Sequence, residues 1–179
     1  MSDPRQTHHG ERIYLRPMRE EDCTERYLSW FRDPEVTHFL EARNLSRDDV
    51  IQHLRAGLAT QSYFMYAVCT KDGDLHIGNV KIGPIRRLHG TSEYSLVIGD
   101  RAYWGNGYAT EITALSMTVG FEQYGIRKFS SGPHASNLGS LLMLLKAGWQ
   151  VEGVQKGQFL LDGKPTDKIC CACFNPRMV

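Results

Sequence analysis

Residues 103–111 constrain the fold more than any other part of the sequence, because two glycines stand there between a strand-like run and a helical run. Residues 91–98 are expected to form a strand and residues 108–123 a long helix. The first N–H groups of a helix lack intrahelical partners, and the helix dipole favours an anion at that end. Gly105 and Gly107 let a ligand approach the backbone, so the stretch predicts a turn that holds a pyrophosphate without positive side chains.

The same glycine turn also fits a tight connection in which the glycines only reverse the chain. Two better-known nucleotide motifs do not match. The dinucleotide fingerprint G-x-G-x-x-G has Thr110 at its third glycine and lies in mid-chain rather than in an opening βαβ unit. A G-x-x-x-x-G-K-[ST] loop is absent. A dinucleotide-dependent enzyme is therefore disfavoured.

The rest of the sequence alternates between strand-like and helical segments, with no internal repeat or linker. Ser46 and Asp49 form a capping box at the start of one helix, whose apolar face is expected to hold Val50, Leu54 and Leu58. The expected strands are residues 12–17, 63–70, 75–83, 91–98, 126–131, 149–157 and 166–174, and the other expected helices are residues 20–31, 108–123 and 137–146. This order predicts one α/β domain, residues 1–179, with a mixed sheet flanked by helices on both faces and a flexible segment at residues 1–10.

Composition narrows the function classes. The formal net charge is +1 with no basic stripe, which disfavours nucleic acid and membrane surfaces as partners. No signal peptide is expected, because residues 1–10 are polar, and no run of about 18 apolar residues is present. Five cysteines without a framework spacing indicate reduced thiols in a cytoplasmic protein. The cluster at residues 170–173 suits small buried strand residues better than a zinc site, so no metal is expected.

Two segments resemble the GNAT family of acetyltransferases. Residues 104–109 (Trp-Gly-Asn-Gly-Tyr-Ala) resemble its acetyl-CoA loop, [QR]-x-x-G-x-[GA]. Trp104 replaces the usual first residue, as in the branch that acetylates amino sugars and protein N-termini, the latter including the ribosomal-protein-alanine acetyltransferases. Residues 137–140 and 145–149 are similar to the family's N-x-x-S…K-x-G-F block, with Trp149 in place of Phe. The resemblance runs from the first expected strand to the last and implies the GNAT fold, with a mostly antiparallel sheet.

The resemblance also implies acetyl-CoA as cosubstrate and assigns residues to it. Asn137 would hydrogen-bond the pantetheine, and Ser140 would lie near the sulfur and donate a proton to the coenzyme A thiolate. Taken alone, Asn137 better suits a helix N-cap or first-turn residue, and Ser140 a solvated hydroxyl in the first turn. Backbone N–H groups beside residues 97–99 would polarise the thioester carbonyl. The other residues expected at the coenzyme are Val97, Ile98 and Gly99 along the pantetheine, and Trp104, Gly105, Asn106, Gly107, Tyr108 and Ala109 at the pyrophosphate.

The general base is less narrowly indicated. Glu93 matches an acidic position on the family's central strand, where it could deprotonate an ammonium group directly or through water. It equally fits a half-buried carboxylate paired with a basic residue. His89 and His134 have suitable ordinary pKa values but also fit surface or strand-end histidines.

The expected reaction is transfer of acetyl to a primary amine by direct attack in a ternary complex. The alternative is a non-catalytic sensor of acyl-CoA. Candidate acceptors are a nucleotide-linked amino sugar, a protein N-terminus, a small antibiotic amine and a polyamine, although a polyamine pocket should be acidic. Arg86 and Arg87 either meet a phosphate of the acceptor or form a solvated loop. A homodimer through an exposed last strand is compatible with the sequence. The residues expected around the acceptor are Trp30, Phe31, Glu35, His38, Tyr66 and His89.

Overall fold

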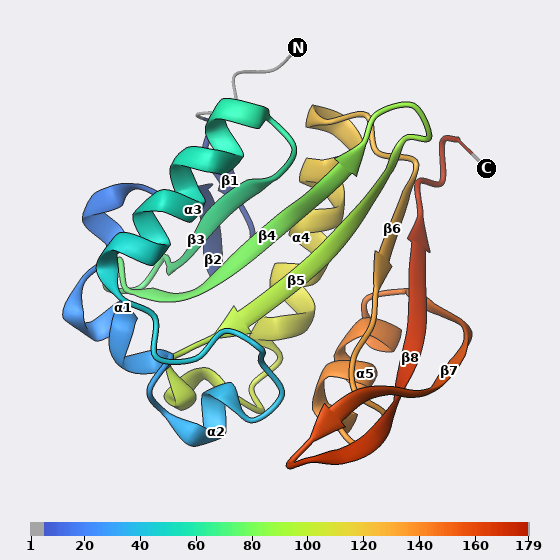
Figure 1. Cartoon of the computed structure of the whole chain (residues 1–179). Helices are drawn as coiled ribbons and strands as arrows, with labels where there is room; N and C mark the ends of the chain where they lie inside the picture. The colour runs from blue at the N-terminus through green and yellow to red at the C-terminus, as the bar shows by residue number, and fades with distance from the viewer. Residues whose placement is uncertain (1–5, 179) are drawn as a thin grey trace.

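The structure, a computed structural model, describes residues 6–178 (Figure 1). The strands of this part of the chain form one sheet in the order β1-β2-β3-β4-β5-β6-β8-β7. Neighbouring strands are antiparallel except β5 and β6, which run parallel. The strands are β1 (His8–His9), β2 (Ile13–Pro17), β3 (Phe64–Thr70), β4 (His76–Arg86), β5 (Thr91–Ile98), β6 (Lys128–Ser131), β7 (Gln150–Leu161) and β8 (Lys164–Phe174). The predicted mixed, mostly antiparallel sheet is confirmed.

Helices cover both faces of this sheet (Figure 1). We call the face under α1 (Glu25–Trp30), α2 (Pro34–Thr37) and α3 (Arg47–Thr60) the front face. The rear face is packed by α4 (Tyr108–Gln123) and α5 (Leu138–Lys146). Side chains alternate between two apolar clusters along a strand, so that Tyr66 and Val68 belong to the rear cluster while Met65 packs on the front one. Two short 3₁₀ turns complete the described helices, Glu20–Asp22 and Arg101–Tyr103.

Local sequence signals explain several of the element boundaries. The Ser46 hydroxyl accepts a hydrogen bond from the Asp49 N–H (3.2 Å), and the Asp49 carboxylate accepts one from the Ser46 N–H (3.0 Å), which confirms the capping box of α3. Gly148 has φ of +84° just beyond α5, the conformation expected of a glycine that ends a helix. β5 and α4 have the predicted bounds.

The N-terminal helices differ from the sequence prediction. Residues 20–31 were expected to form one helix, but a 3₁₀ turn precedes α1 because the Asp22 carboxylate binds Arg16 (2.7 Å) and the Arg19 N–H (2.8 Å), and Thr24 then caps a new helix. Leu58 is 64% exposed; Ile51 is buried instead, and Gly57 lies against Tyr63. The buried stripe of α3 is therefore rotated relative to the expected one.

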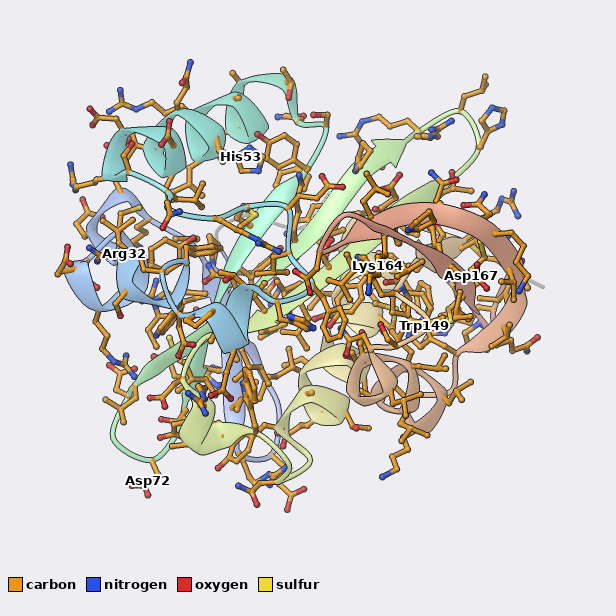
Figure 2. The ribbon with its side chains drawn as sticks, turned by 60° about the horizontal axis from the view of Figure 1, so that its bottom comes forward. Arg32, His53, Asp72, Trp149, Lys164 and Asp167 are labelled. Atoms are coloured by element: carbon orange, nitrogen blue, oxygen red, sulfur yellow. The ribbon has the colours of Figure 1, made fainter. Side chains whose placement is uncertain are left out.

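The two ends of the chain also differ in part from expectation. Of residues 1–10, predicted to be flexible, residues 1–5 lie outside the described part, while His8 and His9 form β1 and pair with β2. The last strand, β8, is not at the edge, because it lies between β6 and β7. β7 is the edge strand, and the β7–β8 ribbon, marked by Lys164 and Asp167, arches over the side of the molecule that carries Trp149 (Figure 2).

Two of the cysteines in the last strand pack into the core, as expected of small strand residues. Cys171 is buried, and Cys171 and Cys173 both belong to the rear cluster. Among residues 6–178, no group of three or more His, Cys, Asp and Glu side chains is placed to hold a metal ion. In the same part of the chain, no helix is long and apolar enough to cross a membrane.

Candidate active site

The sheet opens where its two parallel strands part. β5 and β6 pair only from Thr91 with Lys128 to Glu93 with Ser130, and β5 then continues to Ile98 without a strand on that side (Figure 1). On its other side, the Gly99 N–H donates to the Ile77 carbonyl of β4 (2.9 Å). Since backbone groups alternate along a strand, the N–H groups of Leu96 and Ile98 face the opening. The opening therefore offers a row of backbone hydrogen-bonding groups.

The glycine turn lies at the end of this open strand. The Trp104 indole N–H donates to the Ile98 carbonyl (2.8 Å), which ties the turn to β5. Gly105 and Gly107 have φ of +74° and +80°, a region that favours glycine, and α4 begins immediately after them. An added Cβ at Gly105 would meet no atom within 4 Å, so the backbone there borders open space.

An ion pair fixes the start of α4 against β2. The Glu111 carboxylate accepts hydrogen bonds from the N–H groups of Arg12 (2.8 Å) and Ile13 (3.3 Å) and from the Arg12 Nε (2.8 Å). Arg12 also donates to the Asn106 carbonyl (3.0 Å) and lies 4.2 Å from the centroid of the Tyr108 ring. Burial alone would raise the pKa of Glu111, but these hydrogen bonds outweigh it and lower that pKa. The glycine turn is thus held rigidly from outside.

The parted strand and the glycine turn border one cavity of about 550 Å³, which we call the large cavity. Asn137 caps α5 by accepting a hydrogen bond from the Ser140 N–H (3.1 Å), so its N-cap interpretation is confirmed, and it also lines the cavity. The Ser140 hydroxyl has no hydrogen bond to any described residue. Of the predicted residues, those that line the large cavity are Glu35, Val97, Ile98, Trp104, Gly105, Gly107, Tyr108, Ala109, Asn137 and Ser140.

Two predicted coenzyme residues stand outside this lining. Gly99 is buried, its N–H is used by Ile77, and a Cβ there would overlap the Trp30 ring (1.9 Å). Gly99 therefore allows Trp30 to pack on the strand rather than offering a free N–H group. Asn106 contributes its carbonyl to Arg12 and does not line the cavity.

The large cavity suits a long ligand with a pyrophosphate at one end. The N–H groups of the first turn of α4 point out of the helix beside two glycines, and the edge of β5 can pair with amide groups of an extended arm. Sequence reasoning missed several of its walls: Phe39 and Leu40 from the segment before α3, and Leu142, Met143 and Lys146 on α5. The α5 residues follow Gly139 at helical spacing, a signal that could have identified them.

The described residues also line two further cavities. A basic cavity of about 380 Å³ lies at the start of β5 and β6 and is lined by Pro84, Arg86, His89, Thr91, Ser92, Glu93, Arg127, Lys128 and Ser130. An aromatic cavity of about 230 Å³ lies between the α2–α3 segment and the tip of β7 and is lined by His38, Phe39, Leu40, Glu41, Arg43, His134, Phe159, Leu160 and Leu161. It shares Phe39 and Leu40 with the large cavity.

The candidate bases lie in different cavities. Glu93 is exposed in the basic cavity, at the point where β5 and β6 part, and does not line the large cavity. His134 lies in the aromatic cavity, where its ring stacks on Phe159 (4.3 Å between centroids) and its Nδ1 is 3.0 Å from the Thr166 hydroxyl. Burial, with a smaller effect of His38, lowers the pKa of His134.

Three residues predicted at the acceptor are core residues instead. Trp30 and Phe31 are buried in the front cluster, and Trp30 packs on Gly99. Tyr66 is 1% exposed in the rear cluster, and its hydroxyl is hydrogen-bonded to that of Tyr124. None of the three lines the large, the basic or the aromatic cavity. This burial does not support their predicted place at the acceptor, and a single sequence does not show which face of a strand or helix borders open space.

Comparison with known proteins places this geometry in a family. The model of the acetyltransferase (GNAT) domain matches residues 12–150. An uncharacterised N-acetyltransferase of Bacillus subtilis, YoaA, is 25% identical over 171 residues, which span 93% of this chain and 96% of the relative. Among solved structures, spermidine N-acetyltransferase from Vibrio cholerae with CoA and spermine matches 91% of this chain and 95% of its own (TM-score 0.83, 15% identity). Ribosomal-protein-S5-alanine acetyltransferase from Vibrio fischeri matches 97% and 99% (TM-score 0.83, 17% identity).

Proposed function

The chain belongs to the GNAT acetyltransferase family, and we propose that it moves acetyl from acetyl-CoA to a primary amine by direct attack in a ternary complex. One observation carries the proposal: a single cavity joins the open edge of β5, the glycine turn at the start of α4 and the Ser140 hydroxyl. When bound, acetyl-CoA supplies the activated acyl group.

In this proposal the chain binds the two halves of the coenzyme by backbone groups. The glycine turn and the first N–H groups of α4 hold the pyrophosphate, because the helix dipole and the free donors both favour an anion. The N–H groups of Leu96 and Ile98 face the opening and take the role expected of groups near Val97 and Gly99. They hydrogen-bond the arm of the coenzyme and the acyl oxygen, on which negative charge develops during attack.

Two side chains are proposed to handle protons. Glu93 accepts the proton of the acceptor ammonium, and the free amine then forms the C–N bond as the C–S bond breaks. Glu93 and Val97 are four residues apart, about 13 Å along a strand, so the proton reaches Glu93 through a chain of several water molecules. Ser140 donates a proton to the departing thiolate. His134 is the second candidate base, because its lowered pKa keeps it neutral near pH 7 and its cavity adjoins the large one.

The proposed acceptor is a nucleotide-linked amino sugar or a protein N-terminus. The Vibrio cholerae relative was solved with spermine, but the front face here carries basic side chains near Glu93. Lys81 pairs in register with Ser95 on that face, and Arg86, Arg127 and Lys128 line the basic cavity. A polycation would be repelled by these groups, so a polyamine is disfavoured.

The alternative is a sensor that binds acyl-CoA without turning it over. Calorimetric titration with acetyl-CoA, followed by thiol release against a panel of amines, separates the two. Binding with amine-dependent thiol release supports the enzyme. Binding without release for nucleotide-linked amino sugars, peptides and small amines supports the sensor, and absence of binding overturns both.

A further inference from the structure

The basic cavity has a composition that the transfer reaction alone does not explain. Three of its side chains are cations, Arg86, Arg127 and Lys128, and His89 adds an imidazole, against one carboxylate, that of Glu93. The net charge of the whole chain is only +1, so this local excess is a property of the site and not of the surface in general. A cavity with this lining selects an anionic ligand group.

The three cations of this cavity differ in how far neighbouring carboxylates neutralise them. Lys128 is paired with Glu152 (2.6 Å). Arg127 donates its Nε to the His89 carbonyl (2.6 Å), which holds the guanidinium in place but leaves its charge uncompensated. Arg86 is exposed, and its side chain has no hydrogen bond or ion pair to any residue in the described part of the chain. Two arginines therefore remain available to an incoming anion.

The neighbouring Arg87 does not share this position. It donates to the Gln61 carbonyl (3.1 Å) and is absent from the lining of the basic cavity. The sequence presents Arg86 and Arg87 as one basic pair, whereas the structure separates them. Of Arg86 and Arg87, only Arg86 lines this cavity and can contact a ligand in it.

The cavity is connected to the proposed transfer site by the front face of β5. Glu93, Ser95 and Val97 alternate onto that face, where Glu93 and Ser95 are exposed and Val97 is partly buried in the lining of the large cavity. Four residues of strand separate Glu93 from Val97, about 13 Å. An acceptor that places an anion among the arginines and its amine beside the large cavity must therefore be extended.

We infer that the basic cavity is a subsite for the phosphate of an extended acceptor, whose amine lies at the other end, beside the large cavity. The inference rests on the proposed function. Phosphate is favoured over carboxylate because the planar Arg fork matches its oxygens, and because the hydroxyls of Thr91 and Ser130 in the same lining can donate to further oxygens. Of the proposed acceptors, a nucleotide-linked amino sugar has this chemistry.

The direct test is calorimetric titration with UDP in the presence of saturating CoA, which fills the large cavity and leaves the basic cavity as the phosphate site. The two linings share no residue. Wild-type protein is expected to bind UDP and not uridine. Arg86→Ala should weaken UDP binding at least tenfold, and the matched control Arg87→Ala should leave it within twofold. No UDP binding by the wild type, or equal effects of the two variants, would overturn the inference.

A kinetic comparison tests the same subsite in the working enzyme. Arg86→Ala should raise KM for a UDP-linked amino sugar at least tenfold with little change in kcat, and should not alter KM for the same sugar without the nucleotide. Faster turnover of peptides than of any phosphate-bearing amine would overturn the assignment to phosphate. Acetyl-CoA binding without UDP binding overturns this inference alone, whereas loss of acetyl-CoA binding overturns the proposed function.

Discussion

Gly105→Ala separates the two roles that a glycine in this turn can have, which are turning the chain and admitting a ligand. Gly105 has φ of +74°, and an alanine in the left-handed region costs roughly 1–2 kcal/mol of folding stability. Because Gly105 lines the large cavity and its added Cβ meets no protein atom, the methyl group would stand in the proposed pyrophosphate position.

The structure sets the size of the binding effect and supplies a control. Displacing one charge-assisted hydrogen bond costs about 1.5–3 kcal/mol, which corresponds to about a 10- to 150-fold rise in Kd for CoA. Gly163, in the turn between β7 and β8, has φ of +75° and equally open surroundings but lies outside the cavity lining. Gly163→Ala should therefore lose the same stability with an unchanged Kd.

The assay is calorimetric titration with CoA, paired with denaturant unfolding of both variants and the wild type. The expected result is equal stability losses and an affinity loss in Gly105→Ala alone. Wild-type affinity in Gly105→Ala would refute the assignment of this turn to the coenzyme and leave the glycine as a chain reversal.

Three further predictions concern single side chains. Ser140→Ala should lower kcat about 10²-fold with the Kd for acetyl-CoA unchanged, and a wild-type rate would remove Ser140 from the reaction. Glu93→Gln should lower kcat by a similar factor, whereas an unaltered rate and pH profile would transfer the base role to His134. Glu111→Gln should lower the free energy of unfolding at pH 7 by about 1–3 kcal/mol. Because the pKa of Glu111 is lowered in the folded state, its contribution to the free energy of unfolding is present above about pH 4.3 and fades as pH falls through the folded-state pKa. Urea unfolding should therefore show a smaller difference between wild type and Glu111→Gln at pH 3 than at pH 7. The same difference at both pH values would contradict the ion-pair account.

Much of the architecture was predictable because short-range signals determine it. The capping box at Ser46 and Asp49, the glycine that ends α5 at Gly148, and the bounds of β5 and α4 all follow from residues that act within one turn or strand. The resemblance to the GNAT family added the location of the glycine turn, and most residues expected at the coenzyme do line one cavity.

The features that the sequence did not predict have a different physical cause, since they depend on contacts between distant segments. Tyr66 is a core residue because α4 covers its side of β3, and the helix at residues 20–31 is interrupted because Asp22 binds Arg16 on β2. Arg86 and Arg87 are adjacent in sequence, yet Arg87 binds the carbonyl of Gln61, 26 residues earlier, while Arg86 lines the basic cavity. Periodicity within one segment contains no information on such partners.

The most direct test of the central claim is mass spectrometry of the acceptor after incubation with acetyl-CoA and the amine panel, with free thiol measured in the same reaction. The account predicts one added acetyl group on the amine for each thiol released, and no release without an amine. Thiol release with no acetylated amine would show hydrolysis rather than transfer, and would contradict the assignment of this cavity to N-acetyl transfer.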